Sequence, residues 1–241
     1  MSTRSVENNV SGTKSSRREL LDLTASVAMI IAAGVLIWVN VVEPRARSRS
    51  NGSAAPPVPS APVSIAGFPF EGSPTAKVAI IEFADYQCPF CRVFAQQMYP
   101  KFKERFIAEG KVLFVFRHLP LTTLHPFAGR VAASAACADR QGAFWKMHSL
   151  LFTAPSRLDD AALAGFASQL QLDEQGFASC MGSPDTEVQA DVELAKSLRI
   201  VSTPTFLIGS VLADNRVKVA HVLKGSQVNG ELEAKVNDLL K

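Results

Sequence analysis

The chain has 241 residues, of which 47% are hydrophobic and 20% charged, a composition typical of a folded protein. This length allows one or two domains. The formal net charge is +3, and the excess lies before residue 67, since residues 67–241 contain 18 basic and 18 acidic side chains. A nucleic-acid-binding protein is expected to concentrate positive charge on its folded domain, so the sequence argues against that function.

The first predicted element is a membrane anchor over residues 20–42. Residues 23–42 are 20 consecutive uncharged residues, which as a helix would span about 30 Å, the thickness of a bilayer's hydrocarbon core. A cleaved signal peptide would have a shorter apolar core and a small-residue cleavage site, for which Ser53-Ala54-Ala55 is a weak candidate. Basic residues on both sides argue against a buried core helix, and the lack of a cysteine before Cys88 excludes a lipoprotein. We therefore expect an uncleaved anchor.

The segments beside the predicted anchor orient it only weakly. Four basic residues precede it and three follow it, which by the positive-inside rule slightly favours a short cytoplasmic N-terminus over residues 1–19. Residues 43–66 contain five prolines among Ser, Ala and Arg and show no apolar period. This composition predicts a semi-extended linker.

The globular region, residues 67–241, opens with a predicted β-α-β unit. Residues 77–84 and 111–116 are short apolar runs rich in β-branched residues, as in buried strands. Between them, residues 89–108 predict a helix that ends before Gly110. Two strands joined by a helix favour parallel pairing with a right-handed crossover.

The rest of the globular region predicts a helical segment followed by two strands and a helix. Residues 126–199 are rich in alanine and have breaks near Gly142, at residues 153–155 and at residues 182–184. Residues 204–208 and 216–222 predict an antiparallel pair, and residues 227–240 predict a last amphipathic helix. The fold class we infer is α/β, with a helical insert at about residues 123–199 between a β-α-β half and a β-β-α half.

Cys88-Pro89-Phe90-Cys91 carries the candidate chemistry, because it follows the first predicted strand and opens the predicted helix. The unsatisfied N–H groups and the positive dipole end of a helix N-terminus favour a thiolate. Pro89 fits the first helical position, where no N–H is needed. Cys91 lies three residues on, over the same face, so the pair can close a disulfide. We expect Cys88 to be the exposed attacking thiol and Cys91 to resolve the mixed disulfide.

Two other interpretations of these cysteines compete with redox chemistry. A zinc site could be assembled with Cys137, Cys180 and the four histidines, but that second pair is 43 residues apart and the first lies in a strand–helix turn. The cysteines could also be inert and buried. We favour redox chemistry, and we expect neither a cofactor nor a bound metal.

The sequence Glu82-Phe-Ala-Asp-Tyr-Gln-Cys-Pro-Phe-Cys91, followed downstream by Ser202-Thr-Pro-Thr-Phe206, resembles the DsbA-like thiol:disulfide oxidoreductases of the thioredoxin superfamily. It is most similar to the membrane-anchored branch that includes BdbD-type proteins. The resemblance covers about residues 68–240. It implies a thioredoxin fold with an inserted helical domain, which agrees with the order of the predicted elements.

The resemblance implies roles for individual residues. Cys88 and Cys91 match the family's redox pair, and Thr203-Pro204 matches its cis-proline dipeptide, which lies beside the disulfide and contacts substrate. The residues alone would predict a trans peptide, since only about 5–6% of X-Pro bonds are cis. Glu82 matches a buried acid that assists proton transfer at the second cysteine. The alternative for Glu82 is an exposed carboxylate on a strand.

Phe90 departs from the best-known oxidase pattern, which has histidine at this position. Without an imidazole beside it, Cys88 should be less acidic and the disulfide less oxidising. We expect Phe90 to belong to the substrate-binding residues, together with Thr203 and Pro204.

Cys137 and Cys180 both fall in the predicted helical insert. They could be free and buried, but an even number of cysteines in an oxidising compartment favours pairing. Some relatives in the family carry a second, structural disulfide in this insert, and we expect one here. His118 and His125 are expected to lie in the loop that enters the insert and are given no catalytic role.

The predicted function is the oxidation of cysteine pairs in exported proteins through a mixed disulfide at Cys88. Such a domain belongs outside the reducing cytoplasm, on the periplasmic or extracytoplasmic side of a bacterial inner membrane, which places the N-terminus inside. The resemblance implies reoxidation by a quinone-linked membrane protein, DsbB-like or VKOR-like, and we expect a monomer. The alternatives are a reductase or isomerase of the same fold, or a non-enzymatic metal-binding or chaperone module.

Overall fold

The computed structural model describes residues 29, 31–36, 38, 57–154, 158–183, 185–226 and 229–241. They belong to two compact units, Met1–Ala54 and Ala55–Lys241. Most of the predicted anchor, the predicted N-terminal segment 1–19 and residues 43–56 of the predicted linker lie outside the described residues. Within the described part of the chain, no helix is long and apolar enough to cross a bilayer.

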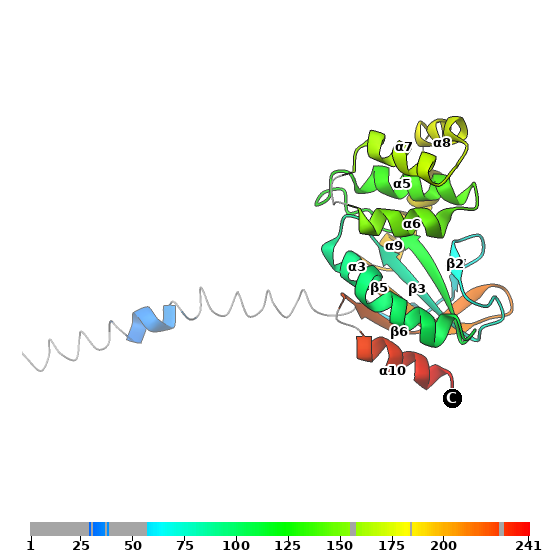
Figure 1. Cartoon of the computed structure of the whole chain (residues 1–241). Coiled ribbons are helices and arrows are strands. Elements are labelled where there is room, and N and C mark those ends of the chain that lie inside the picture. The colour runs from blue at the N-terminus through cyan, green and yellow to red at the C-terminus, as the bar shows by residue number, and fades with distance from the viewer. Residues whose placement is uncertain are drawn as a thin grey trace, which may run out of the picture. The chain divides into compact units, whose positions relative to one another are not determined.

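A six-stranded mixed sheet forms the centre of the second unit, in the order β1-β6-β5-β3-β4-β2 (Figure 1). The strands are β1 (Val63–Ser64), β2 (Phe70–Glu71), β3 (Val78–Ala84), β4 (Val112–His118), β5 (Thr205–Val211) and β6 (Arg216–Lys224). β3 and β4 pair in parallel, whereas the other neighbours are antiparallel. The predicted β-α-β unit and the predicted antiparallel pair are therefore both present. The sequence prediction missed β1 and β2, because two residues show no alternation.

One continuous helical stretch connects β3 to β4, as predicted, but its winding is irregular. It consists of α3 (Pro89–Val93), the π-helix η2 (Phe94–Met98), α4 (Tyr99–Phe102) and the π-helix η3 (Lys103–Ile107). Pro100 has no N–H to donate to the preceding turn, and the helix leaves regular α spacing around it. Gly110 has a φ of +69°, which ends the stretch and turns the chain into β4.

The helical insert lies between β4 and β5, and a further helix closes the chain (Figure 1). The insert comprises α5 (Ala128–Asp139), α6 (Phe144–Thr153), α7 (Asp160–Gln169), α8 (Glu174–Met181) and α9 (Thr186–Ser197), and the last helix is α10 (Asn229–Leu239). The helices are interrupted at the three predicted points and also between α7 and α8, where Gln171 has a φ of 57°. Asp159, Asp173 and Asp185 cap the N-termini of α7, α8 and α9 by accepting hydrogen bonds from backbone N–H groups. The predicted fold class, α/β with a helical insertion, is confirmed for the globular region.

Alternation along β3 directs its side chains into two layers. Val78 and Ile80 pack with the β3–β4 helical stretch and α10, whereas Ala79, Ile81 and Phe83 pack with α9. Glu82 lies two residues after Ile80 and four after Val78, so its side chain is on the same face of the strand as theirs. It therefore points to the face of the sheet that the helix opened by Cys88 covers.

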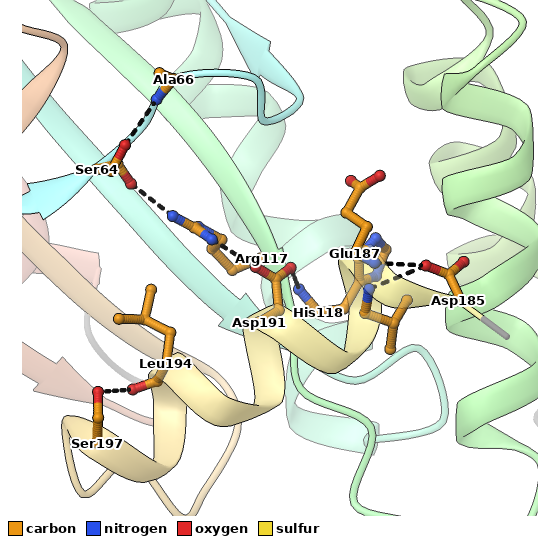
Figure 2. Close-up of polar contacts among 10 residues, drawn as sticks. Ser64, Ala66, Arg117, His118, Asp185, Glu187, Asp191, Leu194 and Ser197 are labelled. Atoms are coloured by element: carbon orange, nitrogen blue, oxygen red, sulfur yellow. Dashed lines mark hydrogen bonds and ion pairs between the residues drawn. The ribbon is translucent and has the colours of Figure 1, made fainter.

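A buried ion pair connects α9 to the sheet (Figure 2). The Arg117 Nη1 donates to Asp191 Oδ1 at 2.6 Å, and the backbone N–H of His118 donates to Asp191 Oδ2 at 2.8 Å. Arg117 Nη2 also donates to the backbone oxygen of Ser64 on β1 at 2.5 Å. Both charged side chains are almost completely buried, so this network fixes α9 against the end of β4.

A disulfide joins α5 to α8 within the insert, between Cys137 and Cys180. These two sulfurs are thus bonded to each other and are not available to complete a zinc site with Cys88 and Cys91. The pair closes a loop with a sequence separation of 43 residues.

Replacing Cys137 and Cys180 together by alanine should lower the free energy of unfolding by about 2–4 kcal/mol, because the unfolded chain gains conformational freedom. Urea denaturation of the two proteins measures the difference. The double variant keeps both cysteines of Cys88-Pro89-Phe90-Cys91, so its thiol chemistry serves as the control. Equal midpoints and slopes for the two proteins would contradict a structural role for this disulfide.

Candidate active site

Cys88 lies where a strand turns into a helix, as the sequence predicts. β3 ends at Ala84, and the next three residues form the turn. Cys88 is the N-cap of α3, and Pro89 is the first residue of the helix. The backbone N–H of Cys88 donates to Asp85 O at 3.0 Å, which closes the turn. Because β3 is completely buried and the helix packs one face against the core, this turn is held from two sides.

The Cys88 thiol is less accessible than predicted. The residue is only 5% exposed, and its Sγ lies 3.5 Å from the backbone oxygen of Thr203, to which the thiol can donate. Thr203 comes from the loop before β5, 115 residues further along the chain. That loop packs over the sulfur, which the sequence could not show. Cys91 has no exposed surface.

The surroundings of Cys88 lower its pKa from 9.0 to about 5. The largest cause is a hydrogen bond from the Cys91 thiol, which outweighs the opposing effect of burial. The backbone N–H groups of Phe90 and Cys91 lower the pKa further. At pH 7 a thiol with a pKa near 5 is about 99% ionised, compared with about 1% at a pKa of 9. Direct donors therefore supply the acidity that the missing histidine at position 90 does not.

The surroundings of Cys91 act in the opposite direction. Burial raises its pKa well above 9.0, and the hydrogen bond to Cys88 and the charge of Glu82 raise it further. The two sulfurs are not bonded to each other in the structure, so it describes the reduced pair. One cysteine is thus held as a thiolate and its neighbour as a proton donor, the asymmetry that a nucleophile and a resolving thiol require.

Glu82 is buried beneath the two cysteines, with 3% of its surface exposed, so the alternative of an exposed strand carboxylate is wrong. Burial raises its pKa from 4.5 to about 8, and the charge of Cys88 adds to the effect. Its Oε1 has no hydrogen-bond partner among the described residues. A carboxyl group in this environment carries a proton at neutral pH and lies in the electrostatic field of both sulfurs.

Thr203 and Pro204 are joined by a cis peptide bond, so the trans peptide predicted from residue statistics alone is wrong. Around this loop and the cysteines, two large apolar side chains are open to solvent. Phe90 is 60% exposed and Val201 is 74% exposed. Phe90 follows Cys88 by two residues, and Val201 precedes Thr203 by two, so both lie on segments that contact the reactive sulfur.

The structure therefore brings together the cysteine pair, Glu82 and the Thr203-Pro204 loop. Cys137 and Cys180 lie apart from this site, in the bonded pair between α5 and α8. The sequence analysis missed Asp85, whose buried carboxylate holds the turn before Cys88, although this residue stands inside the motif that carries the family resemblance. It also missed Val201, since a lone valine gives no signal in sequence.

Glu82→Gln should change how stability depends on pH in the reduced protein. A pKa raised to about 8 means that the folded protein keeps a proton that the unfolded chain releases above pH 4.5. This stabilisation is complete below pH 4.5 and is lost as the pH rises towards 8, at about 1.4 kcal/mol per pH unit. Glutamine does not titrate, so the variant does not lose this stabilisation. The free energy of unfolding of the variant minus that of the wild type should therefore increase by about 1.4 kcal/mol per pH unit between about pH 5 and 7.5. Urea denaturation across this range measures this change, and a pH-independent difference would contradict the raised pKa of Glu82.

Comparison with known proteins agrees with this geometry. The thioredoxin family model matches residues 67–224. The disulfide bond formation protein D of Bacillus subtilis is 30% identical over 170 residues, an alignment that covers 63% of this chain and 72% of that protein. This chain belongs to the thioredoxin family, in its DsbA-like branch. The crystal structure of oxidised BdbD from Bacillus subtilis matches the DsbA-like chain with a TM-score of 0.55 and 27% identity, over 74% of this chain and 98% of BdbD.

Another relative of the DsbA-like chain is much longer. The Na(+)/H(+) antiporter NhaA 3 of Salinispora tropica is 36% identical over 139 residues, which make up 57% of this chain but 21% of the antiporter. The chain thus spans about a fifth of the length of the first curated relatives it matches.

Proposed function

We propose that this DsbA-like chain is a thiol:disulfide oxidoreductase that oxidises cysteine pairs in exported proteins. The observation that carries the proposal is the position of Cys88 at the N-terminus of α3, with Cys91 one turn further on and the backbone oxygen of Thr203 at 3.5 Å from the Cys88 sulfur. The environment lowers the pKa of Cys88 to about 5 and raises that of Cys91 well above 9.0. A reduced state stabilised by a thiolate at Cys88 makes the Cys88–Cys91 disulfide a stronger oxidant.

The reaction begins with the oxidised pair. A substrate thiolate attacks Cys88 Sγ, the Cys88–Cys91 bond breaks, and Cys91 leaves with the electron pair and takes up a proton. A second substrate thiolate then attacks the substrate sulfur of the mixed disulfide, and Cys88 leaves as a thiolate. The substrate gains one disulfide, and the Cys88–Cys91 pair gains two electrons and the proton on Cys91.

In this proposal Glu82 would be the proton source for Cys91. Its carboxyl group is protonated at neutral pH because its pKa is about 8, and it interacts electrostatically with both sulfurs. Once deprotonated, it would take the proton of Cys91 when Cys91 attacks Cys88 Sγ in a mixed disulfide, a step that breaks the bond to the partner sulfur and releases the partner as a thiolate. The Thr203 backbone oxygen and the exposed Phe90 side chain would contact the substrate segment around its cysteine.

The proposed location is extracytoplasmic, with residues 20–42 as the anchor and the N-terminus inside. The similarity to disulfide bond formation protein D and the Cys137–Cys180 disulfide support an oxidising compartment. The proposed partners are reduced cysteine-containing exported proteins and a quinone-linked membrane protein, DsbB-like or VKOR-like, that restores the Cys88–Cys91 disulfide. We propose a monomer as the working form.

The test uses the full chain, oxidised and then mixed in detergent with a reduced peptide that contains two cysteines. We expect one peptide disulfide to form for each Cys88–Cys91 disulfide lost, as measured by mass spectrometry after acid quenching. The reverse preference, with an oxidised peptide reduced at the expense of the Cys88–Cys91 thiols, would support the reductase alternative. Stoichiometric zinc without any thiol exchange would contradict both and support the metal-binding module.

A further inference from the structure

Asp85, the first residue after β3, has a side chain with no exposed surface and three hydrogen-bond donors around it. Its Oδ1 accepts from the backbone N–H of Gln87 at 2.8 Å. Its Oδ2 accepts from the backbone N–H of Leu121 at 2.8 Å and from Nδ1 of His125 at 2.7 Å. A buried carboxylate with three charge-assisted hydrogen bonds is held in one position.

The backbone of Asp85 contacts both cysteines. Its carbonyl oxygen accepts from the N–H of Cys88 at 3.0 Å. Its own N–H donates to the sulfur of Cys91, where it favours the thiolate. A small displacement of this one residue would therefore move the N-cap of α3 and remove a donor from the resolving thiol.

The loop between β4 and α5 is bonded to the same turn along its length. Besides the bonds from Leu121 and His125, the N–H of Leu119 donates to Ala84 O at 2.8 Å. At the far end of the loop, the N–H of Phe127 donates to Gln87 Oε1 at 2.9 Å. Four hydrogen bonds thus join residues 84–87 to residues 119–127, and two of them end on one oxygen of Asp85.

His125 supplies the side-chain donor in this set. Its ring is 20% exposed, unlike those of His118 and His148, which are packed among aromatic rings. Replacing the ring of His125 by an apolar side chain of similar size removes its N–H. It leaves the Asp85 Oδ2 with one donor fewer in a buried position, which is unfavourable enough for the turn to shift.

We propose that Asp85 and His125 are positioning residues of the thiol exchange site, an inference that rests on the proposed function. Neither touches a substrate sulfur. His125 fixes the carboxylate of Asp85, and Asp85 fixes the N-terminus of α3 and the donors around the two sulfurs. The acidity of the Cys88 thiol therefore depends on a loop that precedes the helical insert, outside the Cys88-Pro89-Phe90-Cys91 segment.

The test compares the full chain with His125→Leu and His125→Asn. Leucine fills similar space but cannot donate, whereas the side-chain amide of asparagine can place an N–H near the position of Nδ1. His221→Leu, on β6 and away from the turn, is the matched control. The measurements are the absorbance of the Cys88 thiolate at 240 nm against pH and the rate of oxidation of the reduced two-cysteine peptide.

We expect His125→Leu to shift the thiolate titration to higher pH and to slow peptide oxidation about tenfold, because small errors in alignment are costly in exchange reactions. His125→Asn should recover most of both properties, and His221→Leu should match the wild type. Circular dichroism establishes that each variant is folded. If His125→Leu does not fold, Asp85→Asn takes its place. Asparagine keeps the shape of the side chain, but its NH2 group cannot accept hydrogen bonds from the existing donors.

Two kinds of failure can be told apart. A wild-type chain that does not oxidise the peptide overturns the proposed function itself. An active wild type whose titration and rate are unchanged in His125→Leu overturns the positioning role. So does a folded His125→Asn that is as impaired as the leucine variant, because the donor would then not be what matters.

Discussion

Cys88→Ser is expected to abolish peptide oxidation, with a loss of several orders of magnitude in rate. The sulfur of Cys88 is the atom that the substrate thiolate attacks, and a serine hydroxyl can neither form a disulfide nor ionise at neutral pH. Acid quenching of the reaction with the reduced two-cysteine peptide, followed by mass spectrometry, measures the rate. Cys91 alone cannot replace it, because this residue is buried and its pKa is raised well above 9.0.

Cys91→Ser is the matched variant, because it removes the resolving sulfur and leaves the attacking one. We expect it to accumulate a mixed disulfide between Cys88 and an oxidised peptide, visible by mass spectrometry without reductant. Its Cys88 pKa should also rise, since the Cys91 thiol is the largest cause of the lowered value. Normal turnover in Cys88→Ser would contradict the assignment of the nucleophile.

Asp191→Ala is expected to lower the free energy of unfolding by about 3–5 kcal/mol, the range found when one partner of a buried ion pair is removed. The variant leaves the Arg117 guanidinium charged and 3% exposed, with its partner at 2.6 Å missing. It also removes the acceptor of the His118 N–H. Urea or thermal denaturation measures the loss.

Glu193→Ala offers a control on the same helix. Its ion pair with Lys196 is as short, at 2.6 Å, but both side chains are well exposed. Exposed pairs contribute about 0–1 kcal/mol, so this variant should remain close to the wild type. Equal losses for Asp191→Ala and Glu193→Ala would show that burial does not determine the strength of these pairs.

The fold could be predicted from sequence where the signal is local and periodic. Apolar runs gave the strands around residues 77–84 and 111–116, and breaks near Gly142 divided the insert correctly. The two-residue strands β1 and β2 were missed because so short a segment has no period. The break at Gln171 was missed because glutamine rarely adopts a positive φ, so its sequence gives no warning.

The site could be predicted only where the chain itself brings residues together. Cys88 and Cys91 are one helical turn apart, so their proximity follows from spacing. Their covering by Thr203 depends on tertiary packing, and this is why Cys88 is less exposed than expected. The expectation that Cys88 is less acidic than in the best-known oxidase pattern rested on the residue at position 90, whereas the thiol of Cys91 is the main cause of the low pKa here.

The redox equilibrium of the Cys88–Cys91 pair with glutathione tests most directly whether this disulfide donates oxidising equivalents. The full chain is incubated across a range of reduced to oxidised glutathione, and the fraction of free Cys88 and Cys91 thiols is measured after alkylation. Because Cys88 is held as a thiolate but position 90 lacks histidine, we predict a potential between about −120 and −230 mV, more oxidising than thioredoxin. A potential of about −270 mV, the value typical of thioredoxin, would contradict the proposed oxidase function and show that the pair favours the reduction of disulfides.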